Sequence, residues 1–493
     1  MLSEAEIKKI IETDAASNKK KWARIGQRYY EGDHDIRRYR IFYYNAEGQL
    51  KEDTTRTNVK IPHPFFEELT DQTTQYILSG KEGFVRSNMP ELQLELDKYF
   101  NKNDDFLSEL SEVITGCITK GSEYMYAYKN ERGKTAFQCA DSMGIVEVRA
   151  EETDDNVEYI IYWYVDRIDK DKKVIKRIEV WDKVQTYYYV QEGMGEIRPD
   201  DSKKINPRPH ILIQDEGDET IYFEEYGFIP FFRLDNNRKQ ASGLKTVKDL
   251  IDDYDMMASG LSNNLIDFDM PIHVVKGFEG DNLDELQQNI KTKKIIGMEA
   301  TDQGAGLEVH TIEIPYEARK QKLELDEKNI YRFGMGLNTA GLKDTNATTN
   351  IAIKAAYSLL DLKATKLETN IKKLLRSLCN VVIKEINELN RTDYHIEDVY
   401  YEFTHEVMSN LQENAQTELT NAQTQQTKIT TLLNLAARLD DETMMKAVCD
   451  ALDINYEDIK DKLPDGQEAE TVWKGAQQAL GEIPPEDGGV TDE

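Results

Sequence analysis

The sequence predicts an α+β protein made of two or more substructures, and three observations carry that prediction. At 493 residues the chain exceeds what one ordinary hydrophobic core can hold. Runs of β-branched and aromatic residues gather between about residues 121 and 234, whereas apolar residues at helical spacing dominate from residue 242 onward. Hydrophobic residues make up 39% of the chain and charged residues 31%, so a packed interior under a well-solvated surface is expected.

The first 120 residues predict mostly helix. Residues 1–40 are expected to form one helix that opens on a capping box of Ser3 and Glu6 and stops at Gly32. Residues 58–80 are expected to form a short strand, a proline-bounded turn and an amphipathic helix, and residues 90–120 two further helices. The inward positions expected on residues 1–40 and 58–80 are Ile7, Ile11, Trp22, Ile25, Tyr29, Phe65, Leu69, Tyr76 and Ile77.

From Gly121 to about Leu234 the composition predicts an antiparallel sheet. Strand-forming residues mark four segments in particular: EYMYAYK, EYIIYWYV, KRIEVWD and QTYYYV. The tetrapeptide ERGK after the first of them has the composition of a hairpin turn. Helices followed by this sheet predict an α+β body.

Two helical arms enclosing a small strand-containing excursion follow the body. Apolar residues three and four positions apart predict one stripe on the first arm, formed by Leu244, Val247, Ile251, Tyr254, Met257, Leu261, Leu265 and Phe268. Residues 270–314 read as strand, helix, strand and strand, and Pro315 then starts a second helix over 315–336. Such an arm has little core of its own, so we expect it to pack against other copies of the chain.

A polar loop over residues 337–350 leads into the longest predicted helix, of roughly 39 residues or about 58 Å. Its apolar seam runs through Ile353, Tyr357, Leu360, Ala364, Leu367, Ile371, Leu374, Leu378, Val382 and Leu389. Helices of this length usually cross a domain or brace an assembly. A strand pair is expected near residues 394–403, then helices rich in Gln, Asn and Thr, and finally a tail with the composition of disorder.

The formal charge of −30 argues against a protein that grips nucleic acid by neutralising phosphates. It is compatible with a protein that surrounds DNA, because a negative wall repels the duplex from all sides and leaves it mobile. No apolar run approaches the ~20 residues that span a bilayer, and the acidic, helical N-terminus is not a signal peptide. Four separated cysteines (Cys117, Cys139, Cys379, Cys449) are expected to be unpaired, buried thiols in a reducing cytoplasm.

No motif in the chain predicts catalysis, a cofactor or a metal. The pentapeptide SGLKT from Ser242 lacks the glycines of a phosphate-binding loop, and GAG from Gly304 leads into a strand rather than a helix. The segment HEVMS from His405 has Ser409 where a zinc-binding motif needs its second histidine. We therefore predict that the protein is not an enzyme.

An acidic run on the first arm leaves one enzymatic alternative. Asp249, Asp252, Asp253 and Asp255 are expected to form a solvated or subunit-facing stripe on the helix. The alternative is a nuclease whose carboxylates bind magnesium. That would need convergent carboxylates beside a basic groove, and the sequence offers only a helix-face run.

Four blocks stand out in the chain: RYYEGDHDI from Arg28, NVKIPHPFFEELTDQTTQYILSG from Asn58, GFIPFFRLDNNRKQASGLKTVKDLIDDYD from Gly227 and TTNIAIKAAYSLLDLKA from Thr348. In order and spacing they resemble the portal proteins of tailed bacteriophages, in particular the SPP1-like family of siphophages of Gram-positive hosts. The resemblance covers about residues 5–470. One departure is Thr349-Asn350-Ile351, which stands where the family often has Ser-Gly.

The resemblance implies a portal fold assembled as a ring, commonly of about twelve copies, at one capsid vertex. Residues 1–240 would form an α/β wing, 241–269 and 315–336 two stem helices, 270–314 a small α/β clip and 337–350 a tunnel loop. Residues 351–404 would supply a long wing-crossing helix and a wing strand, 405–480 a helical crown and 481–493 a disordered tail.

The resemblance also implies partners and a location. Portal rings nucleate the procapsid together with scaffold and major capsid proteins, dock the terminase large subunit during packaging and then bind the head-completion adaptor. Double-stranded DNA passes through without sequence-specific contact, and no cofactor or membrane is involved. The protein would occupy the host cytoplasm during assembly and the virion afterwards. The alternative is another acidic, helical capsid component, a scaffold or coat subunit, but a coat protein has no paired arms around a strand module.

Three sets of residues follow as site predictions. The tunnel loop is expected to face DNA through Lys343, Thr345, Asn346, Thr348 and Asn350; the alternative is a plain connection pointing away from the channel. Lys245 and Lys248 would line the channel as a sparse basic ring, or else pair with Asp249 or Asp252 on the same helix. Clip strands carrying Val274, Val309 and Ile312 are expected to add to a neighbouring subunit's sheet, because short exposed edges pair readily.

Overall fold

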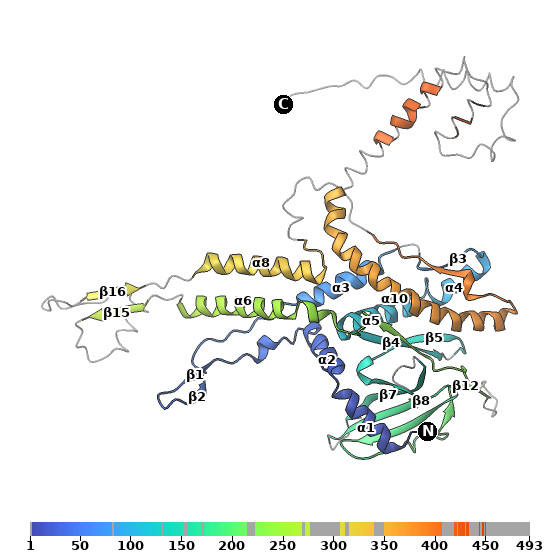
Figure 1. Cartoon of the computed structure of the whole chain (residues 1–493), viewed down its shortest axis with the longest axis horizontal. Helices are drawn as coiled ribbons and strands as arrows, with labels where there is room; N and C mark the ends of the chain where they lie inside the picture. The colour runs from blue at the N-terminus through green and yellow to red at the C-terminus, as the bar shows by residue number, and fades with distance from the viewer. Residues whose placement is uncertain are drawn as a thin grey trace. The chain divides into compact units, whose positions relative to one another are not determined.

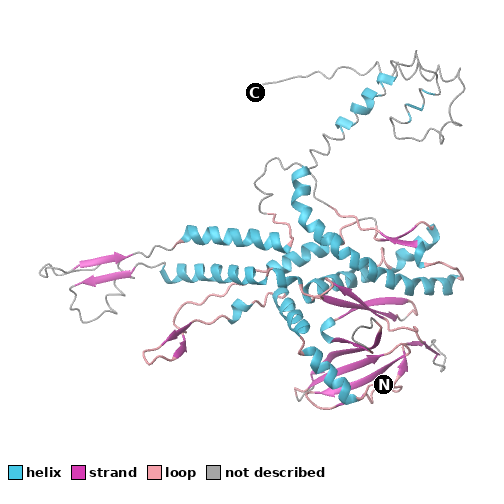
Figure 2. Ribbon diagram, in the orientation of Figure 1, coloured by secondary structure: helices cyan, strands magenta, loops and turns pink. Residues whose placement is uncertain are grey.

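The computed structural model describes residues 2–80, 83–130, 132–150, 156–168, 172–213, 222–268, 272–276, 306–310, 315–339 and 350–406, with several short stretches between 419 and 449. The chain divides into two units, Met1–Asn346 with Ile353–Val407, and Ala347–Ala352 with Met408–Glu493. Helices and antiparallel strands are mixed along the first unit, which confirms the predicted α+β class (Figure 2).

The N-terminal region contains two helices, α1 (Glu4–Ala15) and α2 (Asn18–Tyr30), so the prediction of one continuous helix was wrong. The chain breaks because the Ser17 hydroxyl caps a new helix by accepting from the backbone N–H of Lys20 at 3.2 Å. The capping box of Ser3 and Glu6 is confirmed. The stop at Gly32 is also confirmed, since Gly32 has φ +71°, which favours glycine.

A short 3-10 turn and a hairpin follow α2. The turn is η1 (Asp35–Arg38), and the hairpin pairs β1 (Phe42–Tyr44) with β2 (Leu50–Glu52). The strand predicted near residues 58–61 is absent, and that segment is extended without a partner strand.

The largest hydrophobic core lies among four helices and the strands beside them. The helices are α3 (Phe65–Ile77), α4 (Pro90–Tyr99), α5 (Asp104–Lys120) and α10 (Asn350–Asn390). With 41 residues, α10 closely matches the predicted long helix, and its seam from Leu360 to Val382 is buried. Leu389 is exposed instead, and the hydrophobic core includes no residue of α10 beyond Ile386. Among the other predicted inward residues, Ile7, Tyr29, Leu69, Tyr76 and Ile77 are buried, while Ile11, Trp22, Ile25 and Phe65 are half-buried.

Antiparallel strands follow α5, as predicted, but they form two sheets rather than the single one expected. The first has the order β14-β4-β5 and the second the order β10-β9-β8-β7-β6, with β11 beside β9. The Asn130 N–H donates to the Lys134 carbonyl at 2.9 Å and closes the predicted hairpin turn between β4 and β5. The bounds are β4 (Ser122–Lys129), β5 (Thr135–Ala140), η2 (Ser142–Gly144), β6 (Ile145–Arg149), β7 (Val157–Ile168), β8 (Val174–Trp181), β9 (Gln185–Glu192), β10 (Ile197–Pro199), β11 (Arg208–Pro209) and β14 (Phe231–Asp235).

Three two-stranded pairings besides the N-terminal hairpin complete the described sheets. β12 (Ile211–Ile213) pairs with β13 (Tyr222–Glu224), and β15 (Ile272–Lys276) pairs with β16 (Gly306–His310). β17 (Val399–Tyr401), which follows η4 (Ile396–Asp398), pairs with β3 (Val85–Ser87). We predicted that two strands near residues 394–403 would pair with each other, and this was wrong about the partner. The single strand there, β17, pairs with β3 from the N-terminal part of the chain.

The two predicted arms are present as α6 (Lys248–Phe268) and α8 (Tyr316–Gly334), which run side by side (Figure 1). A 3-10 turn, η3 (Gly243–Thr246), precedes α6, and Pro315 caps α8 rather than forming its first turn. Burial of the predicted stripe on the first arm falls with distance from the body. Leu244, Val247 and Ile251 are buried, Tyr254, Met257 and Leu261 are half-buried, and Leu265 is exposed.

Several predictions lie partly or wholly outside the described residues. These are the helix and last strand of residues 270–314, with Ile312, and the tail after residue 480. The described stretches between 419 and 449 are helical, as expected for that region. The four cysteines are unpaired; Cys117, Cys379 and Cys449 are buried and Cys139 is half-buried.

Candidate functional site

The predicted DNA-facing loop is described only at its two ends. Lys343, Thr345, Asn346 and Thr348 lie outside the described residues, and Asn350 is the first residue of α10. The described start of the loop lies at the junction where α6 and α8 join the body, and it is bound there to Gln72 of α3. Residues of all four sequence blocks meet at this junction, which makes it the candidate site.

A buried carboxylate, Asp255 of α6, forms the centre of the junction. Its oxygens lie 2.6 Å from Nδ1 of His34 and 2.9 Å from both the backbone N and Nδ1 of His63. Asp255 and His34 are both fully buried. Burial by itself would raise the pKa of Asp255, but the hydrogen bonds from His34 and His63 outweigh it and lower that pKa.

The surroundings of His34 place a hydrogen-bond acceptor beside each of its two ring nitrogens. Its Nε2 lies 3.2 Å from the carbonyl oxygen of Tyr29, while its Nδ1 faces Asp255. A carbonyl oxygen and a carboxylate oxygen only accept hydrogen bonds, so both ring nitrogens of His34 are placed to donate. The Tyr29 ring stacks on the His34 ring at 4.5 Å between centroids. The arm is thus held to the end of α2 by hydrogen bonding and ring stacking.

A second network at the junction binds Lys248. Its Nζ lies 2.6 Å from Asp252 and 2.8 Å from Asp35, and it sits 5.0 Å from the centre of the Tyr29 ring. The Tyr29 hydroxyl also donates to Asp252. Lys248 was predicted either to line the channel or to pair with Asp249 or Asp252 on its own helix. Its pairing with Asp252 is confirmed. Lys245, in contrast, lies on η3, is exposed and approaches the Trp22 ring at 5.6 Å.

Of the two roles predicted for the acidic run on α6, a single solvated stripe was wrong, and a subunit-facing stripe stays a prediction. Asp249 is exposed, but Asp253 binds Lys322 of α8 at 2.5 Å, and Asp252 and Asp255 are engaged by the contacts just described. Asp252 and Asp255 thus contact the body, Asp253 contacts α8, and Asp249 faces solvent. Among the described residues, no group of three or more His, Cys, Asp or Glu side chains is arranged to hold a metal ion.

An extended segment, residues 57–63, runs along α6 and is bound to it by a series of hydrogen bonds that we call the polar ladder. The backbone N–H groups of His63, Ile61 and Val59 donate to side chains of α6 over 2.7–3.0 Å, and the Thr57 hydroxyl donates to Asp267. The acceptors are spaced four residues apart on α6: Asp255, Ser259, Asn263 and Asp267.

The spacing of the polar ladder follows from geometry. Two residues of extended chain advance about 6.6 Å, and four residues of helix advance about 6.0 Å, so the two elements stay in step. The ladder supplies the partners that a neighbouring strand would have given residues 57–63. For this reason the segment looks like a strand in sequence and is not part of a sheet.

The start of the 337–350 loop is held by a third set of contacts, the loop anchor, made by Gln72 and Lys363. The Gln72 side chain accepts from the N–H of Leu337 at 2.9 Å and donates to its carbonyl at 3.0 Å. Nζ of Lys363 donates to the carbonyl of Gly334 at 3.1 Å, at the C-terminal end of α8, and to that of Leu69 at 3.3 Å. Burial lowers the pKa of Lys363 to about 8.

Sequence reasoning missed most of these residues. Neither Asp255, Gln72 nor Lys363 was predicted to bind anything, although each belongs to a recognised block. For Asp255 a signal was available, because it follows Ile251 by four residues and so continues the buried face of α6.

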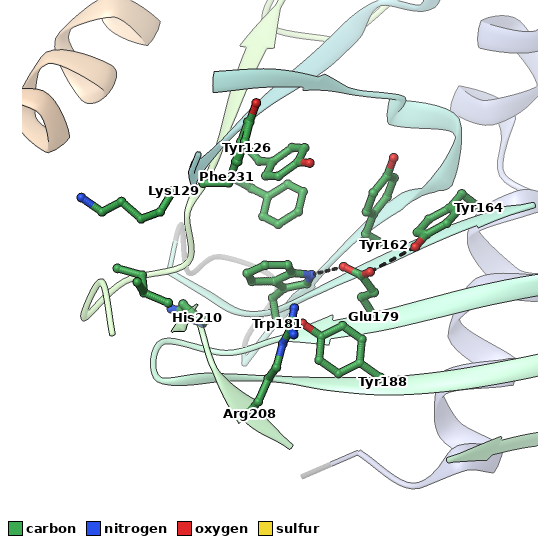
Figure 3. A pocket seen from close by; sticks show the side chains of 12 residues that line it. Tyr126, Lys129, Tyr162, Tyr164, Glu179, Trp181, Tyr188, Arg208, His210 and Phe231 are labelled. Atoms are coloured by element: carbon green, nitrogen blue, oxygen red, sulfur yellow. Dashed lines mark hydrogen bonds between the residues drawn. The ribbon is translucent and has the colours of Figure 1, made fainter. Parts of the chain in front are cut away.

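An aromatic pocket of about 520 Å³ lies away from the junction, against strands of both sheets (Figure 3). Its wall includes Trp181, Phe231 and Tyr188, and Glu179 lies within it. Glu179 accepts from Trp181 Nε1 at 3.1 Å and from the Tyr164 hydroxyl at 3.3 Å, and burial raises its pKa. The polar groups of Glu179, Trp181 and Tyr164 thus bind one another within the pocket.

Comparisons with known proteins agree with the resemblance seen in the sequence. The family model described as "Phage portal protein, SPP1 Gp6-like" matches residues 13–448. The portal protein of Bacillus phage SPP1 is 28% identical over 354 residues, which cover 71% of this chain and 67% of the relative. The portal protein of Clostridium phage phiCD119 is 27% identical over 429 residues, which cover 83% of this chain and 88% of the relative. None of the described helices is long and apolar enough to cross a membrane.

Proposed function

Because the chain belongs to the SPP1 Gp6-like family of phage portal proteins, we propose that its copies form a ring at one capsid vertex and that the genome passes through the centre. The observation that supports this best is the pair of arms. The apolar stripe of α6 is buried only near the body, and its outer end exposes Leu265 and Ile266. An arm with so little internal core gains most by packing against neighbouring copies.

In this proposal the portal is a structural component of the virion and not an enzyme. It nucleates the procapsid with the scaffold and major capsid proteins in the host cytoplasm, docks the terminase large subunit, and later binds the head-completion adaptor. The competing proposal of a scaffold or coat subunit is not supported, because the family match spans residues 13–448.

Ring formation is tested with the purified full-length chain. Light scattering should give a mass near an integral multiple of 56.9 kDa, with about twelve copies expected, and negative-stain images should show rings with a central hole. A species that stays monomeric at all protein and salt concentrations would contradict the proposal. ATP hydrolysis by the pure protein would contradict its non-enzymatic part.

The channel is proposed to pass DNA by weak, non-specific contact. Twelve copies at −30 each would carry about −360, a charge that discourages DNA from sticking. Lys245 is the better candidate for a channel-lining cation on the arm, because Lys248 is held by Asp35 and Asp252. In the tunnel loop, Lys343 stands beside Asp344, and the hydroxyl and amide groups of Thr345, Asn346, Thr348 and Asn350 would touch phosphates without a strong hold.

The loop proposal is tested by replacing Thr345, Asn346 and Thr348 together with Asp. Rings should form as before, whereas packaging or retention of DNA should fail, because the new charges repel phosphate at the narrowest point. A matched control adds Asp at Thr365 and Thr369, which are exposed on α10. Normal genome length and retention in the loop variant would show that the loop is only a connection.

The clip is proposed to join subunits through its strand edges. β15 and β16 pair with each other over five residues, in a register that sets Val274 opposite Glu308 and His273 opposite Val309. Among the described residues of this region each strand has one outer edge without a partner strand, and such edges add readily to another sheet. Replacing Val309 with Asp, or Ile312 with Asp, should therefore weaken rings and adaptor binding. Normal rings that still bind the adaptor would count against the proposal.

A further inference from the structure

The hairpin β1–β2 exposes more apolar surface than its own chain can cover. All six strand residues are exposed, and the exposed fractions are 51% for Phe42, 74% for Tyr44 and 57% for Leu50. Tyr44 lies directly opposite Leu50 in the register, so the two side chains share one face. An isolated two-stranded hairpin is only marginally stable in water. A face of this kind needs a partner.

The polar ladder fixes where this hairpin is presented. The chain leaves β2 at Glu52 and reaches α6 at Thr57, which donates to Asp267 near the outer end of that helix. Figure 1 shows the hairpin on the same side of the body as the arms. The hairpin is therefore carried at the level of the outer part of α6.

The charge of the hairpin segment favours contact with another acidic chain. Over residues 39–57 the three basic residues (Arg40, Lys51, Arg56) balance the three acidic ones (Glu47, Glu52, Asp53), whereas the whole chain carries −30. Two ion pairs form within the segment, Arg40 with Glu52 at 3.1 Å and Arg56 with Asp53 at 3.2 Å. A neutral surface rich in Tyr and Phe has the composition of an interface core, and like-charge repulsion does not oppose its approach to a second copy.

A matching apolar surface lies at the outer ends of the arms. Leu265 and Ile266 of α6 are 49% and 57% exposed, and Tyr316 of α8 is 50% exposed. Because α6 and α8 run antiparallel, the end of α6 and the start of α8 lie close together. Rotation about the axis of a ring leaves the position of every residue along that axis unchanged. If the arms run along the axis, the hairpin of one copy lies at the same position along it as the outer ends of α6 and α8 in the next copy. The two surfaces can therefore meet.

We propose that the hairpin β1–β2 of one copy packs on the outer ends of α6 and α8 of the next copy and braces adjacent arms. This inference rests on the ring of the proposed function. The contact is heterologous, with hairpin against arm, and repeated contacts of that type close into a ring.

A cross-linking experiment on the full-length ring tests the contact directly. The double variant Tyr44→Cys with Ile266→Cys should give a ladder of covalent oligomers on mild oxidation. The matched control, Tyr44→Cys with Met194→Cys, should not, because Met194 is 94% exposed on the turn between β9 and β10. Normal rings without a ladder in the double variant would overturn the inference and leave the ring itself intact.

A second measurement does not depend on thiols. Tyr44→Ser with Leu50→Ser should raise the concentration at which rings dissociate by at least about tenfold, while Met194→Ser leaves it unchanged. The hairpin lies outside the hydrophobic clusters of the body, so the variant should keep the wild-type circular dichroism spectrum.

Hydrogen exchange of residues 42–52 gives the third readout. Amides there should be slow in rings and fast in monomers. Exchange that stays fast in rings and slows only when scaffold or coat protein is added would assign the hairpin to that partner and overturn the inference. Absence of any ring from the wild-type chain would instead contradict the proposed function.

Discussion

Replacing Asp255 with Ala should release the base of the arm from the body. The carboxylate is fully buried and accepts from His34, from the His63 ring and from the backbone N–H of His63. Its removal leaves a buried, donating His34 ring without its partner. Leaving a buried donor without its partner costs roughly 1–3 kcal/mol, because the remaining group stays buried and unsatisfied.

The loss should appear as local opening of α6 and residues 57–63, because both depend on Asp255. At 1.4 kcal/mol per factor of ten, amide exchange in these segments should accelerate by roughly fivefold to a hundredfold. The matched control is Asp249→Ala on the same helix. Asp249 is exposed, so only its effect on the helix dipole is lost, about 1 kcal/mol or less. Equal exchange in the two variants would refute the reasoning.

The pH dependence of this effect has a definite sign. The pKa of Asp255 is lower in the folded chain than its ordinary value of about 3.9 in an unfolded one. Its contribution to stability is therefore complete above about pH 4 and disappears as the pH falls through the lowered value. The difference between the wild type and Asp255→Ala should therefore shrink as the pH falls below about 4. A difference that keeps its size well below pH 4 would contradict this assignment.

Three further predictions concern the loop anchor. The pKa of Lys363 is lowered to about 8 in the folded chain, so the free energy of unfolding should rise with pH between about 8 and 10. Urea unfolding at several pH values should show this rise in the wild type and not in Lys363→Met. Gln72→Ala removes both hydrogen bonds to Leu337 and should lower the free energy of opening the start of the loop by about 1–3 kcal/mol. Proteolysis within residues 337–349 should then be faster, whereas Gln321→Ala, at an exposed position, should leave its rate unchanged. Gly336→Ala would place a Cβ 2.2 Å from Leu69 Cδ2 and should cost about 1–3 kcal/mol in thermal unfolding, whereas Gly260→Ala, whose nearest contact is 3.6 Å away, should be neutral or stabilising.

Local patterns were enough to predict most helices and strands. The 3.6-residue period of α6 and α10 and the β-branched runs of β4, β7, β8 and β9 each identified an element within a few residues of its observed bounds. Boundaries failed where one side chain decided them. Ser17, for example, caps α2 and divides what the sequence presents as one helix. A capping hydrogen bond of this kind competes with continuation of the helix. The spacing of apolar residues does not show which of the two conformations is more stable.

The candidate site was less predictable, because its residues come from distant parts of the chain. The four blocks identified the family, and they contain Asp255, His34, Gln72 and Lys363, but nothing in the blocks says that these side chains meet. Asp255 stands in a run of four aspartates, and only its spacing from Ile251 distinguishes it from the others in the sequence. Only packing of α2 and residues 57–63 against α6 separates the buried one from the exposed Asp249.

The sequence by itself determined the α+β class, the order of body, arms and long helix, the strongly negative charge and the family. These follow from composition, from short-range periodicity and from blocks read along the chain. The tertiary structure decided which strand β17 pairs with, that residues 57–63 bind a helix rather than a sheet, and that Lys248 and Asp255 are tied to the body. The physical reason is that burial and hydrogen-bond partners depend on residues more than 190 positions apart, as for His63 and Asp255, and no local pattern encodes such a meeting.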